Sequence, residues 1–179
     1  MAYATAILAN RGVAFKPHLV KRVQDARTGE SRLTQPAPSY SIPLKEAHVD
    51  AVLRGLAGVV KEGTGRTAFL NAKYTSGGKT GTAQVFGLRG GEYKASQIAE
   101  RLRDHAWYIA LAPLEKPTIA LVAFVENGGF GAEAAAPIAR KVMDAYFDAS
   151  LLEAALKRNV DRSEQVAAAA QAAEVRRAR

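Results

Sequence analysis

The residues best suited to chemistry in this chain lie in one short segment around Lys79. It reads Gly77-Gly78-Lys79-Thr80-Gly81-Thr82-Ala83-Gln84-Val85, with Ser76 in front of it. A lysine and a threonine between glycines can bind phosphate, but a P-loop also needs a glycine at the position that Lys73 occupies here. A P-loop also opens a helix, whereas this segment leads into strand-like sequence. The pattern therefore excludes a phosphate-binding loop.

The same residues suit the active-site strand of an acyl-transfer enzyme. On a strand, Lys79 and Gly81 point to one face while Thr80 and Thr82 point to the other. A lysine in a cleft supplies positive charge to a substrate carboxylate or to the proton transfer of a serine nucleophile, and the glycines let an extended substrate approach the backbone. A backbone N–H just after the lysine can donate to an oxyanion. An exposed strand lysine with glycines at a bend remains the competing interpretation of these residues alone.

Helices are predicted on both sides of this segment in the sequence. Apolar residues spaced as on one helix face predict a helix at about Leu44 to Val60, namely Val49, Leu53, Leu56 and Val60. Thr64 is the predicted cap of a short second helix. A helix is also predicted at Ala134 to Phe147, with one apolar face packed on a sheet by Ile138, Val142 and Tyr146.

Strands are predicted in the middle of the chain. Ser76 to Phe86 forms the first, and the β-branched and aromatic runs Trp107–Ala112 and Thr118–Val125 form an antiparallel hairpin. Residues 33–43, which contain several prolines, are expected to be an irregular connection, and residues 87–105 a loop that carries a helical turn. The fold class is therefore α/β in the wide sense (α+β), with an antiparallel sheet packed by helices.

Composition narrows the class of protein. The chain has 179 residues, 48% of them hydrophobic and 23% charged, which suits one globular domain. The absence of cysteine excludes disulfides and thiolate metal sites, and the dispersed histidines His18, His48 and His105 suggest neither a metal nor another cofactor. The net charge of +8 comes from lysines and arginines scattered among acids, so nucleic acid is not expected as a partner.

Residues Gly77 to Val85 resemble the Lys-Thr-Gly motif of penicillin-binding proteins. Further segments match in the same order. Val59–Ala68 is similar to the helix before that strand in class B enzymes, and three more segments resemble penicillin-binding protein 2, the elongation transpeptidases: Ala99–Tyr108, Val125–Gly129 and Ala135–Arg140. The resemblance covers residues 1–147. It divides the chain into 1–148, the C-terminal part of a transpeptidase domain, and 149–179, an alanine-rich charged tail that is helical or disordered.

The resemblance implies an incomplete fold of the penicillin-binding transpeptidase and serine β-lactamase type. Its implied activity is serine D,D-transpeptidation, which cross-links peptidoglycan stem peptides and is blocked by β-lactams. Lys79 would assist proton transfer and contact the substrate carboxylate, Thr80 would line the strand, and Gly81 would allow close approach. Thr82 would offer its N–H to the oxyanion hole and its hydroxyl to the carboxylate. The implied location is the periplasmic face of the inner membrane, with elongation-complex membrane proteins as partners.

The chain departs from the family pattern at the nucleophile. Its one S-x-x-K string, Ser76 to Lys79, falls on the predicted strand, where residues three apart face opposite sides. No S-x-N sequence occurs. We therefore expect a piece of a larger transpeptidase domain that is inactive alone and exposes apolar surface. A β-lactamase-like or β-lactam-sensor domain and a non-catalytic cell-wall interaction module remain the alternatives.

Overall fold

The computed structural model describes residues 1–85 and 97–177 and divides the chain into two units, Met1–Arg140 and Lys141–Arg179. The described elements, in chain order, are α1 (Ala2–Ala9), β1 (Val13–Phe15), β2 (Arg22–Gln24), β3 (Ser31–Leu33), β4 (Pro38–Ser41), α2 (Glu46–Lys61), α3 (Arg66–Phe69), β5 (Gly77–Ala83), the 3₁₀ turn η2 (Glu100–Leu102), β6 (His105–Ala112), β7 (Ile119–Val125), α4 (Ala135–Phe147) and α5 (Ala149–Arg177).

The centre of the first unit is an antiparallel sheet in the order β5-β6-β7. Strands β6 and β7 form the predicted hairpin, with Tyr108 opposite Ala123, and β5 pairs with β6 so that Lys79 lies opposite Ile109. The segment around Lys79 is thus a strand, as its sequence predicts. Residues 86–96, which include most of the glycine-rich part of the predicted 87–105 loop, lie outside the described residues; the predicted helical turn corresponds to η2.

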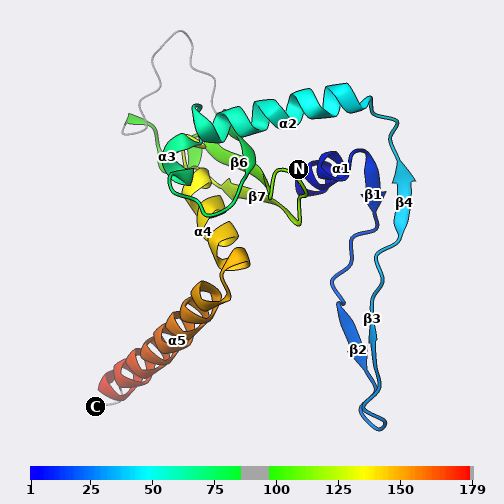
Figure 1. Ribbon diagram of the computed structural model, residues 1–179. Coiled ribbons are helices and arrows are strands. Elements are labelled where there is room, and N and C mark those ends of the chain that lie inside the picture. The colour runs from blue at the N-terminus through cyan, green and yellow to red at the C-terminus, as the bar shows by residue number, and fades with distance from the viewer. Residues whose placement is uncertain (86–96, 178–179) are drawn as a thin grey trace. The chain divides into compact units, whose positions relative to one another are not determined.

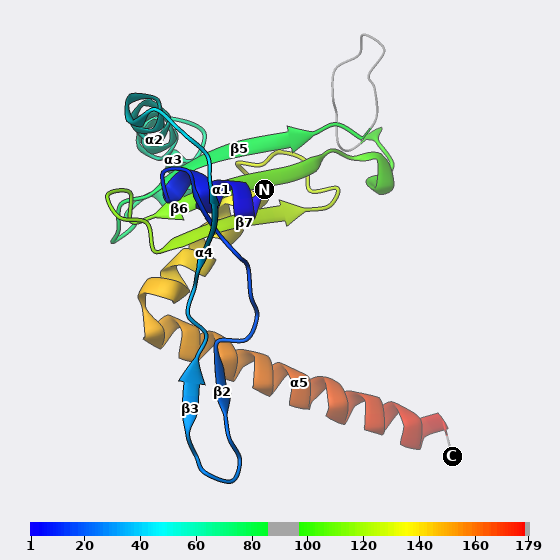
Figure 2. The same ribbon diagram turned by 90° about the vertical axis from the view of Figure 1, so that its right-hand side faces the viewer.

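One face of the sheet is covered by α1 and α2 (Figures 1 and 2). The predicted apolar stripe of α2 is buried at Val49, Leu53 and Leu56, which cluster with Leu111 of β6. A Cβ atom on Gly77 would lie 2.9 Å from the Cβ of Leu56, so the absence of a side chain there lets the helix approach the strand. Packing of α2 therefore fixes the start of β5.

The opposite face of the sheet is occupied by the ring of Tyr108. It is fully buried and stacks on Phe69 of α3, with ring centroids 5.5 Å apart. A Cβ atom on Gly78 would lie 2.2 Å from the Tyr108 hydroxyl oxygen. The two glycines before Lys79 thus serve opposite faces, because Gly77 admits α2 and Gly78 admits the tyrosine.

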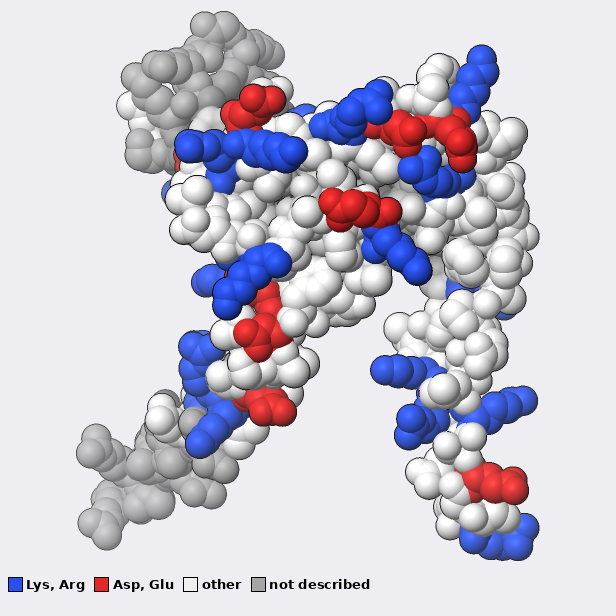
Figure 3. Space-filling view, in the orientation of Figure 1, with Lys and Arg blue, Asp and Glu red and all other residues white. Residues whose placement is uncertain are grey.

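The segment between α1 and α2 forms two antiparallel ribbons rather than an irregular connection. Strand β1 pairs with β4 and β2 pairs with β3, so the prediction for residues 33–43 is wrong for Pro38–Ser41. Proline has no N–H for a ladder, but Pro38 is the first residue of β4, where it is tolerated. Lysine and arginine side chains gather along the β2–β3 ribbon, with an acidic side chain among them near its lower end, and are interspersed with acids elsewhere on the visible face (Figure 3).

The buried side of α4 differs from the predicted one. Ile138, Val142 and Tyr146 are 46%, 48% and 52% exposed, whereas a neighbouring stripe is fully buried: Ala135, Ala136, Ala139 and Met143. Counting large apolar residues predicted the wrong face, because alanines allow a helix backbone to approach its neighbours more closely than branched side chains do. The Arg140 guanidinium donates hydrogen bonds to the carbonyls of Ala68 and Leu70 at 3.3 and 2.9 Å.

The second unit consists of the end of α4 and the long helix α5. The large apolar side chains of α5 whose placement is described, such as Leu152 and Val160, are about half exposed. The alanine content of the segment explains its helical conformation. Within the described part of the chain, no helix is long and apolar enough to cross a membrane. The division of the chain at residue 148 stays a prediction.

Candidate functional site

Strand β5 carries the predicted site residues at an edge of the sheet. Among the described residues it is paired only with β6. Lys79 is exposed, and its Nζ donates a hydrogen bond to the carbonyl oxygen of Thr80 at 2.8 Å. The side chain therefore bends back over its own strand. An amine on an exposed strand edge is accessible to an anionic group on a ligand.

The other three predicted residues follow Lys79 in alternating orientation. Thr80 lies opposite the buried Tyr108, Gly81 opposite Trp107 and Thr82 opposite Ala106. Thr80 and Thr82 thus project from the face opposite Lys79. Thr82 is exposed, while Thr80 is half-buried and its hydroxyl lies 2.8 Å from the hydroxyl of Thr64.

Thr64 has a different role from the predicted one. Helix α3 begins at Arg66 after Gly65, and no side-chain cap bond is present. The Thr64 hydroxyl instead pairs with Thr80, sixteen residues later in the chain. No local pattern gave this contact, since a threonine before a helix is ordinarily read as a cap.

Gly131 is a further residue that sequence reasoning missed. A Cβ atom there would lie 2.3 Å from the carbonyl oxygen of Trp107 and 2.6 Å from that of Gly81. These atoms belong to the backbones of β6 and β5, so they cannot move aside as a flexible side chain can. The loop before α4 therefore closes directly onto the middle of the Lys-Thr-Gly strand. Its glycine-rich sequence indicated a flexible loop but not this contact.

The loop after β7 is fixed beside the start of β6. The backbone N–H of Asn127 donates to Nδ1 of His105 at 2.9 Å, and its side-chain Nδ2 donates to the carbonyl of Arg103 at 2.9 Å. Next to this loop, Phe124 packs on His105 and on Trp107, with ring centroids 5.3 and 4.4 Å away. These hydrogen bonds and ring contacts thus link the loop and the end of β7 to the start of β6.

Ser76 does not join Lys79 in a catalytic pair. It precedes β5, is 6% exposed, and its Oγ has no hydrogen-bond partner among the described residues. The lysine amine is bonded to Thr80 instead. The S-x-x-K string therefore lacks the helical geometry that places a serine beside a lysine, as the strand prediction implied.

Burial raises the pKa of Tyr108 well above that of an ordinary tyrosine. Its hydroxyl has no hydrogen-bond partner among the described residues. The phenol is therefore neutral at physiological pH and acts on β5 by packing rather than by charge.

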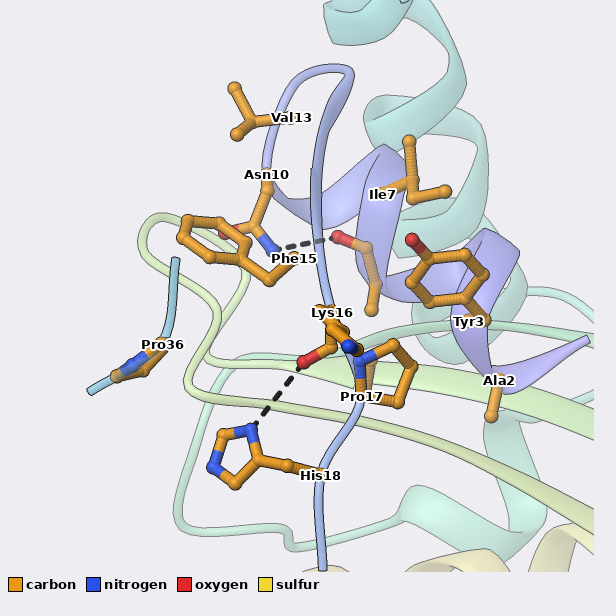
Figure 4. A pocket seen from close by; sticks show the side chains of 12 residues that line it. Ala2, Tyr3, Ile7, Asn10, Val13, Phe15, Lys16, Pro17, His18 and Pro36 are labelled. Atoms are coloured by element: carbon orange, nitrogen blue, oxygen red, sulfur yellow. Dashed lines mark hydrogen bonds between the residues drawn. The ribbon is translucent and has the colours of Figure 1, made fainter. Parts of the chain in front are cut away.

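A groove of about 540 Å³ lies away from β5, between α1 and the β1 region (Figure 4). Its lining is mainly apolar, with Tyr3, Ile7 and Phe15 among the labelled side chains, and none of its residues belongs to β5. His18 also lines it, with its Nδ1 3.4 Å from the carbonyl oxygen of Lys16. Within residues 1–85 and 97–177, no group of three or more His, Asp or Glu side chains could hold a metal ion.

This chain is similar in sequence to proteins of one known family. Residues 1–144 match the family model of the penicillin binding protein transpeptidase domain. The peptidoglycan D,D-transpeptidase MrdA of Haemophilus influenzae is 42% identical over 154 residues, which cover 84% of this chain and 24% of that protein. The chain thus spans about a quarter of the length of this relative.

Solved structures show the same fold. Pseudomonas aeruginosa PBP2 in complex with WCK 5153 has a TM-score of 0.58 and 36% identity, over 79% of this chain and 28% of that one. The imipenem acyl-enzyme complex of Mycobacterium tuberculosis penicillin-binding protein A has a TM-score of 0.61 and 27% identity, over 82% and 30%. The predicted fold class and the resemblance to penicillin-binding protein 2 are thereby confirmed, and the chain belongs to the penicillin-binding protein transpeptidase family.

Proposed function

We propose that this chain supplies the Lys-Thr-Gly wall of a peptidoglycan D,D-transpeptidase that cross-links the cell wall during elongation. The observation that carries the proposal is the place of Lys79: an exposed amine on an extended edge strand, in a chain of this family. An edge strand can bind an extended peptide through its backbone. A stem peptide that ends in D-Ala-D-Ala has both the extended backbone and the terminal carboxylate that such a strand can recognise.

Lys79 and Thr82 are the proposed catalytic residues of this wall. The Lys79 amine assists proton transfer and binds the substrate carboxylate. To do so it must first break its hydrogen bond to the Thr80 carbonyl. That bond is weak, because the lysine side chain is exposed to water. The backbone N–H of Thr82 donates to the oxyanion, and its hydroxyl, exposed on the opposite face of the strand, reaches the carboxylate around the strand edge.

Thr80 and Gly81 form the proposed substrate-binding part of the strand. Thr80 contributes its backbone, because its hydroxyl is held by Thr64. Gly81 lies at the contact with Gly131 and leaves the strand without a side chain at the point where a substrate backbone approaches.

The serine nucleophile must come from outside these 179 residues. The S-x-x-K string of this chain, Ser76 to Lys79, runs into strand β5 and does not lie on a helix. In the complete reaction a serine attacks the carbonyl of the penultimate D-Ala, terminal D-Ala leaves, and the acyl group passes from the serine to an amine of a second stem peptide. Without that serine neither step begins. The isolated chain is therefore inactive in this proposal.

β-Lactams are the proposed inhibitors of the complete domain. The related Mycobacterium tuberculosis protein forms an acyl-enzyme with imipenem. The periplasmic face of the inner membrane and membrane proteins of the elongation complex are the proposed setting and partners, as the resemblance to penicillin-binding protein 2 implies. No nucleic acid, metal or other cofactor has a part in this reaction.

A fluorescent penicillin tests the proposal in two forms of the protein. The 179-residue chain alone should show no covalent label after denaturing electrophoresis, and a label on any of its serines would contradict its inactivity. A chimera supplies the serine: residues 1–144 of this chain replace the matching part of the Haemophilus influenzae relative. This chimera should be labelled.

Two lysine variants of the chimera distinguish the proposed role of Lys79 from a general effect of removing one positive charge. Lys79→Ala should slow acylation about 100-fold or more, the scale of losing a positioned proton-transfer group. Lys73→Ala removes an exposed lysine outside β5 and should leave the rate unchanged. Equal rates for both variants would refute the role of Lys79. Hydrolysis of the penicillin with many turnovers would instead indicate a β-lactamase, and a folded chimera without label would support a non-catalytic module.

A further inference from the structure

The turn between α2 and α3 holds Thr64 in a fixed position. The N–H of Gly63 donates to the carbonyl of Gly58 at 3.0 Å, and the N–H of Gly65 donates to that of Val59 at 3.0 Å. A Cβ atom on Gly63 would lie 2.8 Å from the Cα of Val59, so the chain turns back tightly over the last turn of α2. Such a tight turn leaves the backbone at Thr64, whose side chain is exposed, little freedom to move.

The same turn is fixed from the side of the sheet. A Cβ atom on Gly65 would lie 2.7 Å from the hydroxyl oxygen of Tyr108, whose ring is buried and stacks on Phe69. Tyr108 pairs with Thr80 across the β5–β6 ladder. The α2–α3 turn, β6 and β5 therefore meet around one buried aromatic ring, and Thr64 lies above Thr80 as a result.

The bond between Thr64 and Thr80 acts on the middle residue of the Lys-Thr-Gly motif. Their hydroxyls are 2.8 Å apart, and either can donate. The carbonyl of Thr80 meanwhile accepts the Lys79 amine. Thr80 is thus held by its hydroxyl on one face of the strand, while its carbonyl receives the catalytic amine. A shift of the strand changes the position of that amine and of the Thr82 N–H together.

We propose that Thr64 is a positioning residue for acyl transfer. Its hydroxyl fixes Thr80 and thereby the position of strand β5 relative to the α2–α3 turn, so that Lys79 and Thr82 meet the substrate in reactive geometry. Small displacements of reacting groups reduce rates strongly. The Thr64 hydroxyl bonds to the Thr80 hydroxyl, whereas the Lys79 amine bonds to the Thr80 carbonyl, so Thr64 acts on the amine through Thr80. The inference rests on the proposed function, because it assigns a residue to the same site.

The test uses the chimera described above and measures the rate constant and the final extent of labelling by a fluorescent penicillin. Thr64→Val removes the hydroxyl and keeps the shape of the side chain, and it should lower the rate constant about three- to tenfold, the effect of one neutral hydrogen bond. Thr64→Ser keeps the hydroxyl and should stay within about twofold of the parent.

The extent of labelling distinguishes positioning from stability. A residue that only stabilises the fold changes the fraction of molecules that can be labelled and the melting temperature, but not the rate constant of the folded fraction. Thr80→Val should slow labelling about as much as Thr64→Val, and the double variant should be no slower than the slower single one, since both remove one bond. If Thr64→Val does not melt cooperatively, Thr64→Ala replaces it in the same cycle.

The outcomes are separable. A parent chimera that melts cooperatively but is never labelled refutes the proposed function. A labelled parent whose valine variant reacts as fast as the parent refutes the role of Thr64. A serine variant as slow as the valine variant, or multiplicative losses in the double variant, also overturn it.

Discussion

Removing the hydroxyl of Tyr108 should make the protein more stable, although tyrosine to phenylalanine deletes a polar group at the centre of the fold. The residue is fully buried, and its hydroxyl has no hydrogen-bond partner within residues 1–85 and 97–177. Phenylalanine keeps the ring that stacks on Phe69 at 5.5 Å. The substitution Tyr108→Phe therefore removes a desolvated group while it retains the packing.

The expected gain at pH 8 is about 1 kcal/mol. Burying a hydroxyl without a partner costs about 1–3 kcal/mol in proteins, and the small void left by one oxygen offsets part of that gain. Replacing an exposed tyrosine should change stability by less than about 0.5 kcal/mol. Tyr146→Phe, at a residue that is 52% exposed, is the matched control.

The gain should increase at alkaline pH. Burial raises the pKa of Tyr108 in the folded protein, whereas the unfolded chain has the ordinary value of about 10. Below pH 10 the residue is protonated in both states and its contribution is independent of pH. Above pH 10 only the unfolded state ionises, so the wild type loses about 1.4 kcal/mol of stability per pH unit. Phenylalanine has no such loss, and its advantage reaches roughly 2.4 kcal/mol at pH 11.

Urea unfolding followed by circular dichroism at pH 8, 10 and 11 measures these differences. Two results would refute the reasoning. A Tyr108→Phe variant less stable than the wild type at pH 8 would show that the hydroxyl makes a stabilising bond. An advantage that does not grow between pH 8 and pH 11 would show that the phenol ionises in the folded state as easily as in the unfolded one.

Three further predictions concern the packing of two glycines and the exposed apolar surface of α4. Gly78→Ala should cost about 1–3 kcal/mol, because its Cβ would lie 2.2 Å from the Tyr108 hydroxyl; the cost should shrink in a Tyr108→Val background, as urea unfolding of both variants can show. Gly55→Ala, at an exposed position of α2 with open space around it, should instead stabilise by about 0.5–1 kcal/mol in the same assay. Ile138→Ser with Val142→Ser should reduce concentration-dependent association in sedimentation and leave stability nearly unchanged, since both residues are about half exposed; equal association would place the contact elsewhere.

Local sequence patterns predicted most elements around the site. The stripe of Val49, Leu53 and Leu56 gave α2 and its buried face, and the runs on either side of Pro113–Pro117 gave the β6–β7 hairpin in the correct antiparallel pairing. These patterns succeed because helix and strand periodicities depend on neighbours a few residues away. The residues 86–96 lie outside the described structure, so the prediction there stays open.

The two wrong predictions concern which face of helix α4 is buried and which segment before α2 pairs as a strand. On α4 the large residues Ile138, Val142 and Tyr146 indicated one face, but a stripe of alanines and a methionine is the buried one. In the ribbon before α2, prolines concealed the strand Pro38–Ser41, whose pairing partner β1 lies more than twenty residues earlier in the chain. In both cases the residues were compatible with the observed structure, but only packing against distant elements decided which helix face is buried and which segment pairs as a strand.

The amino-acid sequence alone determined that Lys79, Thr80, Gly81 and Thr82 lie on a strand, because residue types and alternation are local properties, and its resemblance to penicillin-binding proteins indicated the family. Only the tertiary structure decided what holds that strand in place. It brings Thr64 onto Thr80, Gly131 against Gly81 and Tyr108 beneath Gly78, all between residues distant in sequence. Such contacts depend on how closely whole elements can approach, which is set by side-chain volume across the interface rather than by any repeat along the chain.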